Sequence, residues 1–144
     1  MTVDPQLVTR KLLLVARDLD AIRGIHAGGP TAYLASSIAQ AAAERYLERM
    51  VGRMIDVNYH LLTGSGHPPP ADYYASFVQL GAAGILTPDF ARRLAPSAGL
   101  HNRIVHEYDE LDQMKIFEAL ATGIQDVPAY LRDVDRYLQH REGA

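Results

Sequence analysis

Apolar residues recur every three or four positions along most of the chain, which is the spacing of an amphipathic α-helix. No segment shows the strict alternation of a half-buried strand, and the β-branched residues are scattered. The pattern predicts helices over about 5–25, 31–63 and 72–86, a fourth that begins at Thr87, and a last one over 114–140. We therefore expect an all-α fold, an up-down bundle of four to five helices.

Capping residues, glycines and prolines mark where these helices begin and end. Asp4 and Thr87 each precede a proline, which is the arrangement of an N-cap followed by the first helical position. Residues 28–30, Gly-Gly-Pro, end the first helix, and residues 64–70, with three successive prolines, form a loop. Pro128 is expected to kink the last helix or to divide it in two.

The composition indicates one helical domain over residues 1–144. A chain of this length with 48% hydrophobic residues can bury one substantial core. It has no cysteine, which excludes disulfides and thiolate metal ligands. It also has no signal-peptide pattern and no apolar run near the ~20 residues that span a bilayer. We therefore expect a cytoplasmic protein with no membrane partner.

Charge is distributed unevenly. The net charge of −3 does not by itself indicate a nucleic-acid-binding protein. Arg92, Arg93 and Arg103 lie close together in sequence, however, and an acidic run from Glu107 to Asp112 follows them. A phosphate chain could therefore approach this region from one side only.

Another group of arginines, Arg45, Arg49 and Arg53, repeats every four residues in the second predicted helix. The simpler interpretation is a solvated face with partners such as Glu48. A surface that faces RNA or a protein partner is the alternative.

Residues 101–108, His-Asn-Arg-Ile-Val-His-Glu-Tyr, carry more polar chemistry than a core helix requires, and we call them the motif. If the motif is helical, Asn102 and His106 share a face because they are four residues apart. Arg103 then lies within reach of both His106 and Glu107. The motif is the first candidate for a functional site.

The side chains of the motif suit the cleavage of RNA. A neutral imidazole takes a hydroxyl proton near pH 7, which makes His106 the candidate general base. Negative charge that develops on the phosphoryl group requires a fixed cation or hydrogen-bond donors. Asn102 would hold the imidazole in one tautomer or donate to phosphate. No metal-ligand set is readable, although the acidic residues from Glu107 onward leave a metal open.

A structural interpretation of the motif is also consistent with the sequence. Histidines on helices are often surface or hydrogen-bonded residues, and Arg103 with Glu107 has the spacing of an ordinary ion pair. Tyr108 would then fill the core with its hydroxyl at the rim.

The motif resembles the signature of HepT-like toxins of the HEPN ribonuclease superfamily, which reads Arg-Asn, three residues, His, one residue, Tyr. Asn102, His106 and Tyr108 match this signature, and His101 replaces its arginine. The chain length, the long helix before the motif and the Tyr-Leu helix after it extend the resemblance to roughly the whole chain.

The resemblance implies a toxin ribonuclease of a HEPN/MNT toxin–antitoxin pair that cleaves RNA, tRNA among the candidates, without metal or other cofactor. It implies a homodimer that does not act on DNA, and a nucleotidyltransferase antitoxin that attaches AMP to Tyr108. For the attached nucleotide to reach the site of His106, the helix must end near Glu107.

His101 is the departure from the family pattern, and it weakens the expected activity because a neutral imidazole replaces a permanent charge. Either a phosphate that raises the pKa of His101 or the nearby Arg103 would restore the charge. The catalytic candidates are therefore His106, His101, Asn102 and Arg103. The alternative function is a non-catalytic helical subunit that only binds a nucleotidyltransferase.

Overall fold

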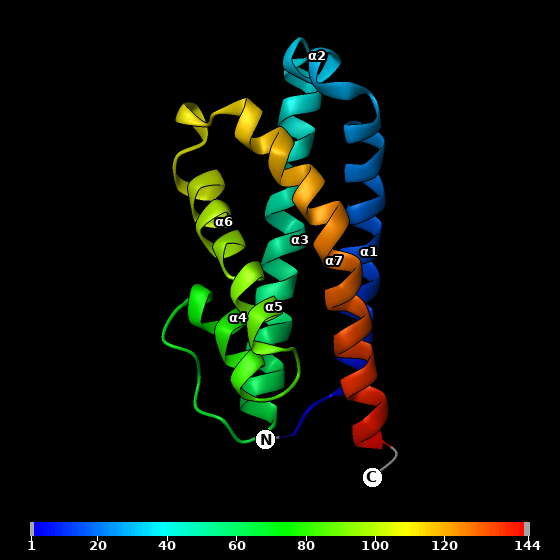
Figure 1. The fold of residues 1–144 in the computed structure, drawn as a ribbon, viewed down its shortest axis with the longest axis vertical. Helices are drawn as coiled ribbons and strands as arrows, with labels where there is room; N and C mark the ends of the chain where they lie inside the picture. Colours follow the sequence, from blue (N-terminus) through cyan, green and yellow to red (C-terminus); the bar gives the residue numbers. More distant parts are fainter. Residues whose placement is uncertain (1, 143–144) are drawn as a thin grey trace.

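The computed structural model describes residues 2–142 and is all-α, as expected (Figure 1). No strand is present in this part of the chain, and none of its helices combines the length and apolarity needed to cross a bilayer. The elements are α1 (Pro5–Ala27), α2 (Gly29–Leu34), α3 (Ser37–Gly64), α4 (Tyr73–Ala82), α5 (Pro88–Leu94), α6 (Pro96–His106), the 3₁₀ turn η1 (Tyr108–Glu110) and α7 (Gln113–Glu142).

Helix α3 is the centre of the bundle. It packs against α1 and α7 on one side and against α4 and α6 on the other, and α5 joins α4 to α6 (Figure 1). The long helices α1, α3 and α7 form the main layer, and the shorter helices α4 to α6 cover the remaining face of α3. The motif helix α6 is therefore held by α3 rather than by the other long helices.

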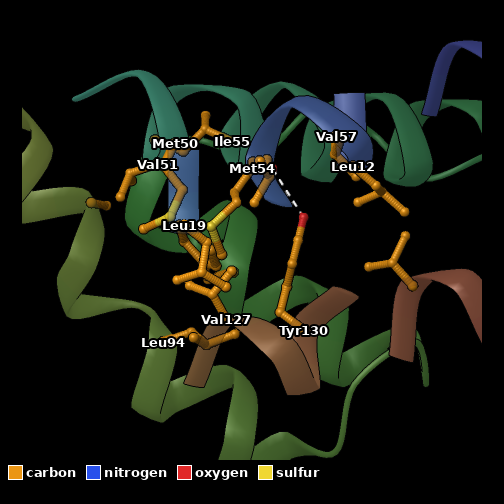
Figure 2. Close-up of a cluster of buried hydrophobic side chains, with 14 of the residues drawn as sticks. Leu12, Leu19, Met50, Val51, Met54, Ile55, Val57, Leu94, Val127 and Tyr130 are labelled. Carbon is orange, nitrogen blue, oxygen red and sulfur yellow. Dashed lines mark hydrogen bonds between the residues drawn. The ribbon is translucent and has the colours of Figure 1, made fainter. Parts of the chain in front are cut away.

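A network of buried polar side chains in the core joins the three helices α3, α4 and α7. The hydroxyl of Tyr130 on α7 donates to Asn58 Oδ1 on α3 (2.7 Å) and lies 3.2 Å from the Met54 carbonyl, a second possible acceptor that Figure 2 shows by a dashed line. Asn58 in turn donates to Ser76 Oγ on α4 at 3.1 Å. Burial raises the pKa of Tyr130. These bonds satisfy polar groups that would otherwise be costly to bury.

A buried carboxylate fixes α1 against α3. Asp18 is 2% exposed and accepts from Arg49 Nη2 at 2.9 Å and from Arg53 Nη1 at 2.8 Å. Arg45 pairs with Glu48 at 3.3 Å, as the solvated interpretation of this arginine series expects. Arg49 and Arg53 instead bind Asp18 and so hold α1 against α3. Asp18 lies too far from them in sequence for their spacing to predict this contact.

The predicted helix over 31–63 is wrong at its N-terminus. Residues 29–34 form the separate helix α2, and Ser36 caps α3 by accepting from the Ala39 amide at 3.1 Å. Helix α4 is shorter than predicted because Gly84 adopts a positive φ of 79°, which ends the helical segment.

The predicted motif helix is also divided. Thr87 caps a helix as expected, with its hydroxyl accepting from the Phe90 amide at 3.3 Å, but this helix ends at Leu94. Helix α6 begins at Pro96, because proline has no N–H to continue the preceding helix. Pro128, by contrast, does not divide α7, and the ribbon of α7 bends about midway (Figure 1).

Candidate functional site

Helix α6 ends inside the motif, at His106. Glu107 has non-helical dihedrals (φ −129°, ψ 32°), its amide donates to the Arg103 carbonyl at 2.7 Å, and the chain then turns through η1. The acidic residues that follow are unfavourable at the negative end of the helix dipole, which is consistent with this end point. The helix therefore ends where the AMP-attachment hypothesis requires, although the side chain of Tyr108 lies outside the described residues.

The helical repeat distributes the motif side chains around α6, and the rotation of α6 about its axis determines which of them face the core. Ile104 is buried against the core. His101 is half-buried on one flank, and Arg103 lies on the opposite flank. Asn102 and His106 are both exposed on the side away from the core, which we call the outward face. The four catalytic candidates therefore do not converge on one pocket.

The flank with His101 faces α3 and α4. Its ring lies edge-on to Tyr73, with ring centroids 6.0 Å apart, and it shares a pocket of about 330 Å³ with Arg49, Gly52 and Arg53. The Nδ1 atom is buried, without a hydrogen-bond partner among residues 2–142. Burial lowers the pKa of His101 below its usual 6.5, so the imidazole is neutral at pH 7.

The flank with Arg103 faces α7. Arg103 lines a second pocket, of about 310 Å³, which we call the Arg103 pocket and which lies between α3, α6 and α7. Arg103 forms no ion pair within the described part of the chain, so the helical pair with Glu107 considered from the sequence is not made. Its guanidinium is free to meet an anion.

The outward face brings together Asn102 and His106, one helical turn apart. His106 also follows Arg103 by three residues, which places the two on adjacent sides of the helix. An exposed amide, an exposed imidazole and a guanidinium without an ion-pair partner among residues 2–142 are thus available to one ligand that lies along α6. His101 is the motif candidate that this arrangement leaves apart.

Sequence reasoning missed the residues that other helices contribute to these surroundings. Lys115 of α7 lines the Arg103 pocket, and Tyr73 of α4 contacts His101. Neither residue has a signal in its local spacing, because its position depends on how α4 and α7 pack beside α6.

The sequence matches the family described as Ribonuclease HepT-like over residues 16–134. It is also 35% identical over 136 residues to the tRNA nuclease HepT of Aphanizomenon flos-aquae (strain 2012/KM1/D3). This match covers 94% of the chain and 92% of the relative.

Solved structures share the fold. YutE from Bacillus subtilis, described as a cytosolic protein of unknown function, has a TM-score of 0.82 at 18% identity, with coverage of 100% of this chain and 97% of that one. The tri-AMPylated Shewanella oneidensis HEPN toxin in complex with MNT antitoxin has a TM-score of 0.71 at 20% identity, with coverage of 95% and 97%. The family match and the 35% identical relative confirm the resemblance read from the motif. The chain belongs to the ribonuclease HepT-like family.

Proposed function

We propose that the protein cleaves RNA at the outward face of α6, with tRNA as the substrate class. The HepT-like family match supports a ribonuclease, and the relative with 35% identity is named a tRNA nuclease. The observation that carries the proposal is the exposure of Asn102 and His106, one turn apart, on the side of α6 away from the core. A phosphodiester can approach both side chains there without any movement of the core.

In this proposal His106 is the general base. Its neutral imidazole takes the proton of a ribose 2′-hydroxyl, and the 2′-oxygen attacks the adjacent phosphorus. The bond between phosphorus and the 5′-oxygen breaks, and that oxygen leaves with a proton from water. The products are a 2′,3′-cyclic phosphate and a 5′-hydroxyl end. The nucleophile belongs to the substrate, so the step requires no metal-bound water.

Arg103 supplies the positive charge that the reaction needs. The phosphoryl oxygens gain negative charge in the transition state, and a fixed cation stabilises them. His101 is poorly suited to this role, because burial lowers its pKa and its ring faces α3. Arg103 is permanently charged, unpaired within residues 2–142 and three residues from His106. Arg103, rather than a His101 protonated beside phosphate, is therefore the better supported replacement for the family arginine.

The antitoxin partner is proposed to act on the segment that follows α6. A nucleotidyltransferase of the MNT type would attach AMP to Tyr108, whose backbone lies in η1 just beyond the end of the helix. The Shewanella oneidensis HEPN toxin is itself described as tri-AMPylated and in complex with MNT antitoxin. We also propose that the protein forms a homodimer, in which the α6 helices of the two copies face one cleft. AMP at this turn would add bulk and negative charge beside His106, which opposes RNA binding.

The test is the chemistry of the RNA ends. Purified protein incubated with total tRNA in the presence of EDTA is expected to produce fragments with 2′,3′-cyclic phosphate ends. Activity that depends strictly on added Mg²⁺ or Mn²⁺ would contradict the mechanism.

The second candidate function is a non-catalytic subunit that only binds its nucleotidyltransferase. The observation in its favour is His101, which is neutral and half-buried where the family motif has arginine. This candidate predicts binding of the antitoxin without any RNA cleavage, so the same assay distinguishes the two.

A further inference from the structure

The Arg103 pocket has an apolar floor that the proposed reaction does not use. Met50 and Met54 of α3 line it, together with Leu100 of α6 and Val127 of α7. Figure 2 shows both methionine side chains pointing toward Val127. Both methionines are only 1% exposed and underlie the floor, whereas the half-buried Leu100 and Ala119 supply apolar surface that a ligand can touch. The floor is therefore suited to the flat face of an aromatic ligand.

The rim of the pocket is charged. Arg93, Arg103 and Lys115 contribute cations, and Arg93 pairs with the buried carboxylate of Asp126 at 3.3 Å. Neither Arg103 nor Lys115 forms an ion pair with any residue that the structure describes. Two cations from facing helices, α6 and α7, therefore stand at the edge of an apolar hollow. This combination matches a ligand that has an apolar ring and a phosphate.

We propose that the Arg103 pocket binds one nucleotide of the RNA substrate, with the base on the apolar floor and its phosphate between Arg103 and Lys115. The proposal rests on the proposed ribonuclease function and adds a substrate subsite to it. The volume of about 310 Å³ is at the small end of ligand pockets, which suits a single nucleotide. Glu118, also on the lining, can accept a hydrogen bond from an exocyclic amino group of the base.

The position of the pocket connects it to the candidate general base. Arg103 and His106 are three residues apart, so their Cα atoms differ by about 4.5 Å along the axis of α6. A nucleotide held at Arg103 therefore directs the adjoining phosphodiester along α6 toward His106. The pocket would position the RNA for cleavage, and it would favour bases that fill its floor.

The experiment uses the methyl signals of the methionines. The chain has four methionines, of which Met50 and Met54 line the pocket and Met114, 41% exposed, is not among its lining residues. In protein with ¹³C-methyl methionine, titration with 5′-AMP is expected to shift the Met50 and Met54 signals more than that of Met114, which precedes Lys115 and lies outside the pocket lining. Inorganic phosphate alone is expected to shift neither. Met50→Leu and Met54→Leu variants assign the signals, because this exchange conserves volume.

Two matched variants test the location. Ala119 lines the pocket and Ala121, two residues further along α7, is exposed outside it. Ala119→Phe fills the hollow and is expected to weaken 5′-AMP binding by about tenfold or more, whereas Ala121→Phe is expected to leave it unchanged. Both variants are compared by circular dichroism for folding.

The proposal is overturned if 5′-AMP moves neither methionine signal, if it moves Met114 equally, or if Ala119→Phe binds as well as Ala121→Phe. A pocket that holds an apolar protein side chain would give the first of these results. The titration requires no RNA cleavage, so it can fail while the ribonuclease assay succeeds. If the assay fails instead, binding of 5′-AMP can still be observed.

Discussion

The imidazole of His101 lies against Gly52, with Nε2 3.3 Å from the position that a Cβ at residue 52 would take. The contact joins the motif helix to the middle of α3. It holds residue 101, where the family motif has arginine, on the flank of α6 rather than on its outward face. The absence of a side chain at residue 52 is what allows the ring to approach so closely.

Gly52→Ala tests this contact. Alanine in the interior of α3 favours the helix by about 1 kcal/mol relative to glycine, and the ring of His101 can shift by a few tenths of an ångström into the adjoining pocket. We expect a gain of up to about 1 kcal/mol in the free energy of unfolding, measured with urea, and an unchanged cleavage rate. A loss of stability would mean that the ring cannot move, and a slower reaction would mean that its position matters to catalysis.

Glutamine substitutions at Arg103 and His101 locate the catalytic charge. Loss of a group that stabilises the transition state commonly costs about 10²–10³ in kcat. We expect a decrease of this size for Arg103→Gln, measured at saturating RNA, and a much smaller change for His101→Gln. Equal decreases in kcat for the two variants, or a larger decrease for His101→Gln, would mean that His101 supplies the catalytic charge.

The lowered pKa of His101 predicts how stability depends on pH. The unfolded chain takes up a proton near pH 6.5, whereas the folded chain does so only at lower pH, because burial disfavours the imidazolium. Glu48 and Asp56 act in the opposite direction, but less strongly. The unfolded state therefore binds more protons in this window, and the free energy of unfolding should fall as pH drops below about 6.5.

The control for the pH dependence is His101→Gln, which cannot titrate. Comparison of urea unfolding at several pH values isolates the contribution of His101 from that of the carboxylates. We expect the curve of the variant to be flatter than that of the original chain in the same window. Parallel curves would show that the folded and unfolded states bind protons equally at residue 101.

Tyr108 is the predicted site of modification by the antitoxin. Co-expression with a nucleotidyltransferase of the MNT type is expected to increase the mass of the chain by one or more AMP units. Tyr108→Phe removes the accepting hydroxyl, whereas Tyr74→Phe removes the hydroxyl of an exposed tyrosine on α4 as a control. A mass increase that persists in Tyr108→Phe would exclude this residue as the acceptor.

The features that depend on a few neighbouring residues were predictable from the sequence. The caps at Asp4 and Thr87 and the end of α6 near Glu107 follow from local hydrogen bonding and helix electrostatics. The break before Pro96 also has a local cause, but the helical spacing of apolar residues continues across it and conceals it. Periodicity alone therefore joined α5 and α6 into one helix.

The features that depend on packing were not predictable. The carboxylate of Asp18 that holds Arg49 comes from a different helix, 31 residues earlier in the chain. The spacing of His101, Asn102 and His106 separates them around α6, but which of these sides faces α3 and which is exposed depends on the rotation of α6 about its own axis, which packing determines. The spacing of a motif shows which side chains share a side of the helix, and only the packed helix shows which side is exposed.

His106 is the residue on which the account depends most directly. The measurement is kcat for tRNA cleavage, in EDTA, by the original chain, by His106→Ala and by His67→Ala, the last being an exposed loop histidine that serves as a matched control. Loss of a general base is expected to lower kcat by about 10²–10⁴-fold in His106→Ala, with His67→Ala unchanged. Cleavage by His106→Ala at the rate of the original chain, with the same cyclic phosphate ends, would contradict the assignment of the site.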